Sequence, residues 1–366
     1  MRSLVFHVTT PTSTLGRVAG SEDAVSVTWL LGSDHGSAVR ISPVQVAASV
    51  VVATHNRAHL LGRLIAALER QEGGGSFEVV VVDDASTDDT CEVVERLATT
   101  SRVPLKALRV AHHSGPATAR NVGWRAASGE VIAFTDDDCV PQPGWLAALT
   151  THVIDSDIVQ GRTLPDPAQA PRLGPFSHTM LVTGEDGFYQ TCNVAYRRGV
   201  LERVSGFDER YRHAYGEDVD LAWRAKDTGA TSAFAADAVV HHDVTPSSLV
   251  DHVRRTKRLE NVVLAVRGHP RARSYCYRRW FYQSSHPAAL LALSGIAVAT
   301  APRVPRPWRT AGIACVLPYL RLRTVVNPLR VRRRYRLAVT PLALVADLAE
   351  IAVLAKASVR HRTLLL

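Results

Sequence analysis

The amino-acid sequence predicts an α/β protein, in which a doubly wound, mostly parallel sheet flanked by helices is followed by a mainly α-helical, basic region. Strand-like and helix-like patterns alternate from residue 46 to residue 138, which is typical of parallel strands joined by right-handed crossovers. The strand-like runs show no polar alternation, as expected when helices cover both faces of a sheet. With 366 residues and 46% hydrophobic side chains, the chain is long enough for a large domain and an appendage.

The individual elements can be placed along the chain. Each expected strand runs into a polar turn, and each expected helix carries apolar residues at helical spacing. We expect strands at 46–54, 77–84, 103–111 and 130–135, alternating with helices at 58–71, 86–100 and 115–128. Beyond these we expect a helix at 141–153, a strand from residue 157, and then a short strand, two helices and a closing strand within 187–244.

Composition divides the chain into three predicted parts. Residues 1–45 form an N-terminal extension of unclear role, with short strand-like runs at 3–8 and 24–31. Residues 46–247 form the predicted catalytic domain, and residues 248–366 a basic helical region. From residue 251 onward there are 22 Lys and Arg against four Asp and Glu, whereas the preceding 250 residues hold 21 basic and 30 acidic side chains. The net charge of +9 therefore comes from the C-terminal part.

Polar clusters follow three of the expected strands. The first is Thr-His-Asn at 54–56, the second Asp83-Asp84, and the third the run Asp-Asp-Asp at 136–138. Because ligands of doubly wound sheets bind beyond the carboxyl ends of the strands, these clusters are expected to converge on one crevice. Three adjacent carboxylates repel one another unless a cation lies among them. An Asp-x-Asp pair at a strand end can hold Mg²⁺ or Mn²⁺ and so bind a diphosphate, although capping or turn formation is the alternative for such a run.

A second acidic cluster, Glu217 and Asp218, begins a predicted helix. A carboxylate here can accept the proton of an attacking hydroxyl, while capping of the helix dipole is the structural alternative. The chain has neither GxGxxG after its first strand nor a GxxxxGK[ST] loop, so the dinucleotide fingerprint and the P-loop are absent. A nucleotide site must therefore rest on the carboxylates.

Taken together, these motifs resemble the family 2 glycosyltransferases, which have the GT-A fold. The resemblance covers about residues 49–243, and it is carried by motifs that occur in the family's order and spacing: VVVATHNRAHLLGRLIAAL, VVVDDASTDDT, GPATARNVGWRAASGEVIAFTDDDCVP, GFDERY and GEDVDLAWRAKDTG. It implies a GT-A-like fold and the transfer of a sugar from a nucleoside-diphosphate-sugar, with inversion at the anomeric carbon. The family implies a role for Mn²⁺ or Mg²⁺, and we expect a UDP-sugar donor and a glycan or lipid-linked acceptor.

The same resemblance implies roles for individual residues. Asp218 is expected to be the general base, with Glu217 beside it to position the acceptor. His55 stands where the family usually has Tyr or Phe. The metal ligands implied are Asp136, Asp138 and His241, with His242 as the neighbouring candidate. The residues implied to bind the nucleotide sugar are Ala53, Thr54, His55, Asn56, Asp83, Asp84, Arg120, Asp136 and Asp137.

The basic region predicts a membrane partner. Its apolar runs at 287–302 and 337–357 are short or interrupted by charge, which fits interfacial helices better than spans. Few aromatic residues accompany its arginines, so we expect no nucleic acid and instead contact with an anionic membrane surface. The alternative is a helical subdomain that packs on the core or on a second copy of the chain. Five scattered cysteines favour a reducing compartment, so we expect a cytoplasmic protein, peripheral at the inner face of the cell membrane.

Two other functions remain open at this point. A sugar-phosphate nucleotidyltransferase shares the α/β sheet and an acidic metal site, but normally carries a Gly-rich basic loop after its first strand. A non-catalytic module that binds a nucleotide sugar at the membrane would need no complete set of Asp136, Asp138 and Asp218.

Overall fold

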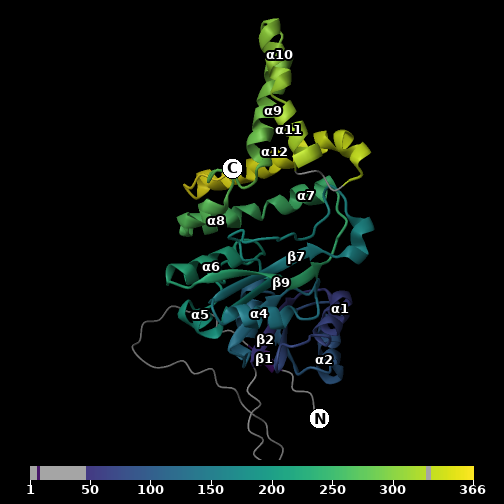
Figure 1. Cartoon of the computed structure of the whole chain (residues 1–366), viewed down its shortest axis with the longest axis vertical. Helices are drawn as coiled ribbons and strands as arrows, with labels where there is room; N and C mark the ends of the chain where they lie inside the picture. The colour runs from purple at the N-terminus through teal and green to yellow at the C-terminus, as the bar shows by residue number, and fades with distance from the viewer. Residues whose placement is uncertain (1–5, 9–46, 327–330) are drawn as a thin grey trace, which may run out of the picture.

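The computed structural model describes residues 6–8, 47–326 and 331–366 (Figure 1). Within these residues nine strands form a single sheet. The strands are β1 (Phe6–Val8), β2 (Ala48–Thr54), β3 (Phe77–Asp83), β4 (Leu105–Val110), β5 (Val131–Thr135), β6 (Cys139–Pro141), β7 (Ile158–Pro165), β8 (Asn193–Arg197) and β9 (Ser232–His242). Their order across the sheet is β1-β4-β3-β2-β5-β8-β7-β9-β6.

Most of the sheet is parallel, as predicted. The run β1-β4-β3-β2-β5 is parallel throughout, β8 lies antiparallel between β5 and β7, and β9 is parallel to β7. Thr54 pairs with Asp83, so β2 and β3 end level with each other. The short strand β6 then pairs antiparallel with the end of β9 and ties the run of aspartates to that strand. This register brings the polar strand ends to one edge.

Helices cover both faces of the sheet. The helices of the sheet domain are α1 (Ala58–Leu68), α2 (Thr90–Thr100), α3 (Pro116–Ala126), α4 (Trp145–Val153), α5 (Arg198–Arg203) and α6 (Glu217–Asp227). Alternate residues of one strand enter different cores: Val50 and Val52 pack with α1 and α4, whereas Val51 packs with α3. The apolar runs in the sequence are thus explained by two-sided burial.

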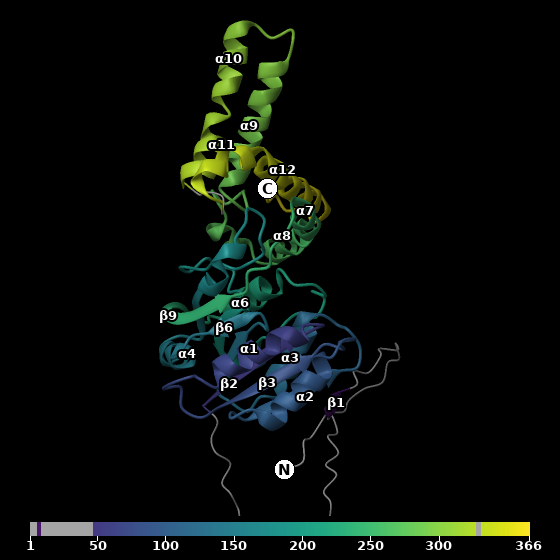
Figure 2. The same ribbon diagram turned by 90° about the vertical axis from the view of Figure 1, so that its right-hand side faces the viewer.

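The C-terminal region is helical and lies against the sheet domain through α6 (Figures 1 and 2). Its helices are α7 (Leu249–Thr256), α8 (Leu259–Gly268), α9 (Ser285–Thr300), α10 (Arg306–Ala314), α11 (Leu317–Arg321) and α12 (Arg336–Arg360). Short helical turns lie at Pro167–Arg172, Pro270–Tyr275, Leu322–Val326 and Arg333–Tyr335. Val219 and Trp223 of α6 share an apolar cluster with α8 and with Leu354 of α12. The helix that carries the acidic pair is therefore held from both sides.

The structure confirms the predicted alternation and refines its boundaries. Helix α2 begins at Thr90, later than the expected residue 86, because Asp88 accepts hydrogen bonds from the backbone and hydroxyl of Thr90 and turns the chain first. The run at 3–8 contains β1, while the run at 24–31 lies outside the described residues. In the part of the chain described, one segment, Arg333–Arg360, is long and apolar enough to cross a membrane, and 39% of its most apolar window is buried inside the protein.

Candidate active site

The three adjacent aspartates at the end of β5 are each paired with an arginine. Arg57, in the turn after β2, places Nη1 2.8 Å from Asp137 Oδ1 and 2.9 Å from Asp138 Oδ2. Arg120 of α3 places Nη2 2.9 Å from Asp136 Oδ1. Two cations from distant parts of the chain thus offset the repulsion between the three carboxylates. The side chain of Arg57 is 43% exposed, so it can move aside for a ligand at the same oxygens.

The middle aspartate differs from its neighbours in burial. Asp137 is buried, and its Oδ2 accepts a hydrogen bond of 2.7 Å from the Thr54 hydroxyl. Burial raises its pKa to about 6, despite the charge of Arg57. Its contact with the nucleotide sugar stays a prediction, because Asp137 is buried whereas its neighbours Asp136 and Asp138 are partly exposed.

His242, the last residue of β9, faces Asp138. Its Nδ1–H donates to the carbonyl oxygen of Asp243 at 2.9 Å, because that oxygen can only accept, and this hydrogen bond orients Nε2 toward Asp138. That Nε2 lies 3.5 Å from Asp138 Oδ1. Burial alone would raise the pKa of Asp138, but His242 and Arg57 lower it below the usual range, so the carboxylate stays anionic. A carboxylate oxygen and an oriented imidazole are a donor set that Mn²⁺ accepts.

The predicted metal ligand His241 is corrected to its neighbour. Ligand atoms of Asp138, Cys139 and His242 lie within 4.8 Å of one another. His241 pairs with Val140 across the β6–β9 ladder, and side chains of successive strand residues point to opposite faces, so His241 faces away from Asp138. Burial raises the pKa of the Cys139 thiol well above its usual value. The thiol therefore stays protonated and is the weakest ligand of the three.

The acidic pair lies at the start of α6. Gly216 precedes it with φ +94°, and a Cβ there would lie 2.8 Å from the carbonyl oxygen of Asn261 in α8, so only glycine fits this approach. Glu217 is buried, and its Oε1 forms an ion pair of 3.0 Å with Arg120 Nη1. Burial and the Glu217 carboxylate raise the pKa of Asp218 well above its ordinary value. Asp218 is thus a carboxylate with raised proton affinity at a helix N-terminus.

Arg120 connects the two acidic clusters. One of its terminal nitrogens binds Asp136 and the other binds Glu217. Asp218 is close enough to contribute to the raised pKa of the guanidinium, behind the contributions of Asp136 and Glu217. Burial of Arg120 opposes that increase and is outweighed by the three acids. The structure therefore brings the predicted metal-binding and general-base residues to one place around a buried guanidinium.

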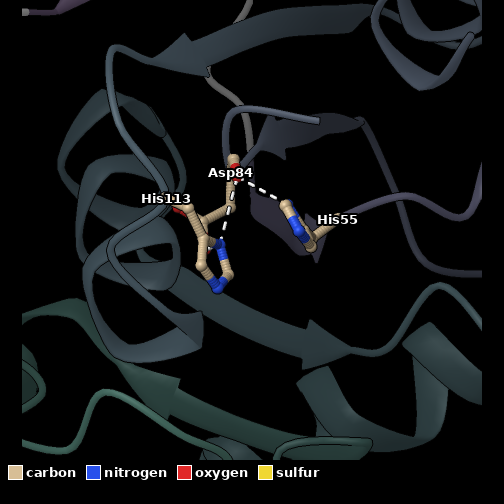
Figure 3. A group of neighbouring side chains, drawn as sticks. All are labelled: His55, Asp84 and His113. Atoms are coloured by element: carbon tan, nitrogen blue, oxygen red, sulfur yellow. Dashed lines mark hydrogen bonds and ion pairs between the residues drawn. The ribbon is translucent and has the colours of Figure 1, made fainter. Parts of the chain in front are cut away.

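A stacked pair of histidines lies at the neighbouring strand ends (Figure 3). The rings of His55, after β2, and His113, after β4, have centroids 4.0 Å apart and planes 27° apart. His55 Nδ1 lies 2.7 Å from the carbonyl oxygen of Asp84, and His113 Nδ1 lies 2.9 Å from Asp84 Oδ2. The Asp84 carboxylate also accepts the backbone N–H groups of Ser114 and Gly115, so it fixes the loop that carries His113. The predicted contact of Asp84 with a base stays a prediction.

The remaining predicted nucleotide residues have varied surroundings. Ala53 is half-buried, and Asn56 is exposed with its side-chain oxygen accepting the backbone N–H groups of Thr87 and Asp88. Asp83 is 1% exposed, lies 3.2 Å from Arg109 Nη1 and accepts the backbone N–H of Ser86. The buried side chain of Asp83 thus stabilises the turn after β3, and its place in the donor site stays a prediction.

Two protein-family models match this chain. The family model of glycosyl transferase family 2 matches residues 49–205, and that of glycosyl transferase family group 2 matches residues 131–346. The chain belongs to the family 2 glycosyltransferases. The match through residue 346 extends beyond the sheet and includes most of the C-terminal helices.

Two curated relatives and one solved structure illustrate the similarity of this family 2 glycosyltransferase. It is 30% identical over 209 residues to the pre-mycofactocin glycosyltransferase of Mycobacterium tuberculosis, covering 53% of this chain and 42% of the relative. It is 30% identical over 207 residues to glycosyltransferase AglE of Haloferax volcanii, covering 54% of this chain and 67% of that relative. The chain thus matches less than half the length of the mycobacterial relative. A mannosyltransferase structure from Pyrobaculum calidifontis, in complex with GDP-Man and Mn²⁺, has a TM-score of 0.53 at 19% identity, covering 86% of this chain and 88% of that one, and this confirms the GT-A-like fold.

Three side chains of this family 2 glycosyltransferase site were not singled out by sequence reasoning. Arg57 was passed over although it directly follows the Thr-His-Asn turn. Neither His113 nor His178 is among the residues expected from the sequence to form the site. The ring of His178 packs edge-on to His242 at 6.1 Å, and burial, with the charge of His242, lowers its pKa to about 4. A basic or imidazole side chain near a strand-end motif is the only signal the sequence offered for them.

Proposed function

We propose that this family 2 glycosyltransferase moves a sugar from a nucleoside-diphosphate-sugar to a hydroxyl group of a glycan or lipid-linked acceptor, with inversion at the anomeric carbon. One observation carries the proposal: Arg120 holds Asp136, at the end of β5, and Glu217, at the start of α6, by ion pairs of 2.9 and 3.0 Å. A donor-binding acid and the acidic pair that faces the acceptor thereby share one site.

Asp218 is the proposed general base. As the acceptor oxygen attacks the anomeric carbon, its proton passes to the Asp218 carboxylate, and the bond to the leaving diphosphate oxygen breaks with its electron pair on the diphosphate. The raised pKa of Asp218 suits this role, because a base with greater proton affinity takes the proton more readily. Glu217, which pairs with Arg120, lies beside the base, and its negative charge helps to raise the pKa of Asp218.

Asp138, Asp136 and His242 are the proposed ligands of a divalent cation, Mn²⁺ or Mg²⁺. When bound, such a cation stabilises the negative charge that the departing diphosphate gains. The oriented Nε2 of His242 favours Mn²⁺, since Mg²⁺ prefers oxygen ligands. Arg57 pairs with Asp138 in this structure and supplies a positive charge beside the proposed ligands.

A UDP-sugar is the proposed donor class. His55 and His113 offer flat aromatic surfaces beside the predicted base-binding residue Asp84. The imidazole of His55 stands where the family usually has Tyr or Phe, and such a ring can still stack on a base. The choice of uracil over thymine and guanine rests on the family resemblance.

The proposed location is the cytoplasmic face of a membrane, where a lipid-linked acceptor and an anionic surface meet. The strong positive charge of residues 251–366 supports this location, because each Lys or Arg near anionic lipid contributes ~1 kcal/mol.

Nucleotide-dependent stability and product release test the proposal together. The purified chain should melt at a higher temperature with UDP and Mn²⁺ than with EDTA, since a ligand at 100 times its Kd stabilises a fold by ~2.7 kcal/mol. GDP, dTDP and CDP serve as comparisons.

With a labelled UDP-sugar and vesicles made from a membrane lipid extract, a transferase releases UDP and labels the lipid fraction. Pyrophosphate release from UTP and a sugar phosphate would instead identify a nucleotidyltransferase. Binding without any release would leave only a binding module.

A further inference from the structure

The helices α9 and α10 form a hairpin that projects away from the rest of the protein (Figures 1 and 2). The hairpin continues through α11 back to the base, where it meets α12. Much of its apolar surface is uncovered by any other part of the described chain. The exposed large apolar side chains on it are Leu291, Leu293, Ile296, Val298, Trp308, Ile313 and Leu317.

The two arms touch through glycine. A Cβ on Gly295 would lie 2.4 Å from the carbonyl oxygen of Gly312, and a Cβ on Gly312 would lie 2.6 Å from that of Gly295. The backbones therefore approach as closely as helices can, which is how helices associate where lipid, and not water, surrounds them. Apart from Gly295, the described upper half of α9 has no fully buried residue. A helix that is apolar all round is normally buried in protein or in lipid.

Helix α12 differs from the hairpin, because ion pairs hold it to the rest of the protein. Helix α12 also has the length and composition of a span, but its acidic residues Asp347 and Glu350 point into the protein. They bind His252 of α7, His286 of α9 and Arg323 of the turn Leu322–Val326. Moving α12 into lipid would break these ion pairs, so α12 belongs to the protein and the hairpin remains as the apolar element without a cover.

Charge along the hairpin indicates what covers it. No charged residue occurs in 287–302 or in 310–320. Exposed arginines bound this uncharged band at both ends, with Arg303, Arg306 and Arg309 at the tip and Arg321 at the base. An uncharged band between two cationic ends matches a hydrocarbon layer between phosphate-bearing headgroups.

We propose that the α9–α10 hairpin inserts into an anionic lipid bilayer and anchors the protein there. Helix α9 rises about 24 Å, somewhat less than the ~30 Å hydrocarbon thickness, and arginine side chains at the tip extend the reach to phosphates. A second copy of the chain is a less suitable cover, because two hairpins side by side would bring like-charged tips together. The anchor goes beyond the proposed transfer reaction and is tested by binding alone, so its failure leaves that proposal untouched.

Co-sedimentation of the full chain with vesicles of phosphatidylcholine and phosphatidylglycerol tests the anchor. We expect binding to persist in ~1 M salt, where the screening length falls to ~3 Å and purely electrostatic adsorption is lost. Release of the protein at high salt would overturn insertion.

Paired variants locate the contact. Leu291→Glu with Ile296→Glu places two carboxylates in the band, and we expect at least a ~10-fold loss of vesicle binding. Ile154→Glu is the matched control, since Ile154 is 71% exposed on the sheet domain, and it should bind normally. Equal binding by both proteins would overturn the proposal. So would a change from dimer to monomer in the double variant with vesicle binding intact, because it would assign the hairpin to self-association.

A third measurement does not depend on the folding of a charged variant. Trp308 is 67% exposed at the tip. Brominated acyl chains should quench its fluorescence, and the quenched component should disappear in Trp308→Phe. Unchanged quenching in Trp308→Phe would show that the tip does not enter the bilayer.

The tip arginines supply a fourth test. Replacing Arg303, Arg306 and Arg309 by glutamate should weaken binding to anionic vesicles at least ~10-fold and remove the preference over neutral ones. The control replaces the exposed arginines Arg70 and Arg96 of the sheet domain by glutamate and should leave that preference in place. An undiminished preference in the tip variant would contradict the assignment of the arginines to headgroups.

Discussion

The protein buries carboxylates in two regions, at the strand ends and under the C-terminal helices, and the two groups are satisfied to different extents. At the strand ends the pKa of Asp137 is raised to about 6, that of Asp218 is raised well above its ordinary value, and Glu217 has a buried oxygen without a partner among the described atoms. Under the helices, the two carboxylate oxygens of Glu350 each lie 3.0 Å from an imidazole Nε2, one of His252 and one of His286.

Both carboxylates of the second region have partners on both oxygens. Asp347 accepts the Tyr319 hydroxyl at 2.5 Å, the Ser285 hydroxyl at 3.2 Å and a two-point contact from Arg323. Burial would raise the pKa of Glu350, but its hydrogen bonds with the two histidines lower it to about 2. Satisfied charges of this kind hold α12 to α7 and α9. Carboxylates with raised pKa values and spare oxygens are instead typical of sites that bind ligands or move protons.

The largest expected effect is a loss of activity when a carboxylate of the strand-end region, Asp218, is replaced. Asp218→Asn keeps the shape of the side chain but removes the base, and we expect kcat to fall ~10²–10⁴-fold. Because only the deprotonated carboxylate accepts a proton, wild-type activity should decline as pH falls through the raised pKa of Asp218. Steady-state release of nucleoside diphosphate measures both effects.

Asp237→Asn is the control for this variant. Asp237 is 68% exposed on β9 and, within the described residues, forms an ion pair only with His152, so its replacement should leave kcat unchanged. Asp218→Asn should also retain donor binding and melting temperature. Wild-type turnover in Asp218→Asn would remove this residue from the mechanism.

The next effect concerns stability. Glu350→Gln breaks the two histidine contacts, and we expect a loss of ~3 kcal/mol in the free energy of unfolding of the C-terminal region. The pKa of Glu350 is lowered from 4.5 to about 2, so its stabilisation is complete above pH 4.5 and disappears as pH falls toward 2. Denaturant titrations at several pH values measure this, and the acid-dependent part should be missing in the variant.

Glu260→Gln tests whether any C-terminal acid would behave similarly. Glu260 on α8 pairs with Arg360 at 2.7 Å, but that arginine is 68% exposed. We therefore expect Glu260→Gln to lower the free energy of unfolding by less than ~1 kcal/mol. If the two variants lose equal stability, burial and pairing do not distinguish Glu350.

A smaller effect sharpens the assignment of the cation site. His242→Ala removes an oriented imidazole from Asp138, and we expect the Mn²⁺ concentration for half-maximal activity to rise at least ~10-fold. His241→Ala is the matched control on the opposite face of β9 and should leave the Mn²⁺ requirement unchanged. Isothermal titration with Mn²⁺ and UDP measures the same difference without turnover. The reverse order of the two variants would restore the original assignment to His241.

The His241 and His242 pair shows what the sequence could and could not supply. Apolar runs and strand-end motifs were enough to predict the parallel sheet and the convergence of its strand-end polar clusters, because parallel strands end at a common edge. Arg120 and Asp218 lie on helices, and only the family resemblance placed them at the same site. The runs and motifs could not decide between adjacent histidines, since that choice depends on the one-residue register of β6 against β9.

Long-range side-chain partners were also beyond the sequence. Arg57 pairs with two aspartates about 80 positions later, and the pairing depends on where the turn after β2 places a flexible side chain. The C-terminal acids were read as interruptions of an apolar segment. Their histidine and arginine partners lie on other helices, so neither composition nor periodicity indicated that α12 is held inside the protein.

The smallest expected effect concerns donor recognition by the stacked histidines. His113→Ala removes the ring that lies 4.0 Å from His55, and we expect the KM for the nucleotide sugar to rise ~2–10-fold with kcat little changed, since an aromatic contact contributes ~0.5–1.5 kcal/mol. His112→Ala, one residue earlier and exposed in the same loop, should leave KM unchanged. His113→Phe keeps a flat ring and should restore most of the loss. A loss in His113→Phe as large as in His113→Ala would point to the contact with Asp84, and not to stacking, as the reason the site needs this imidazole.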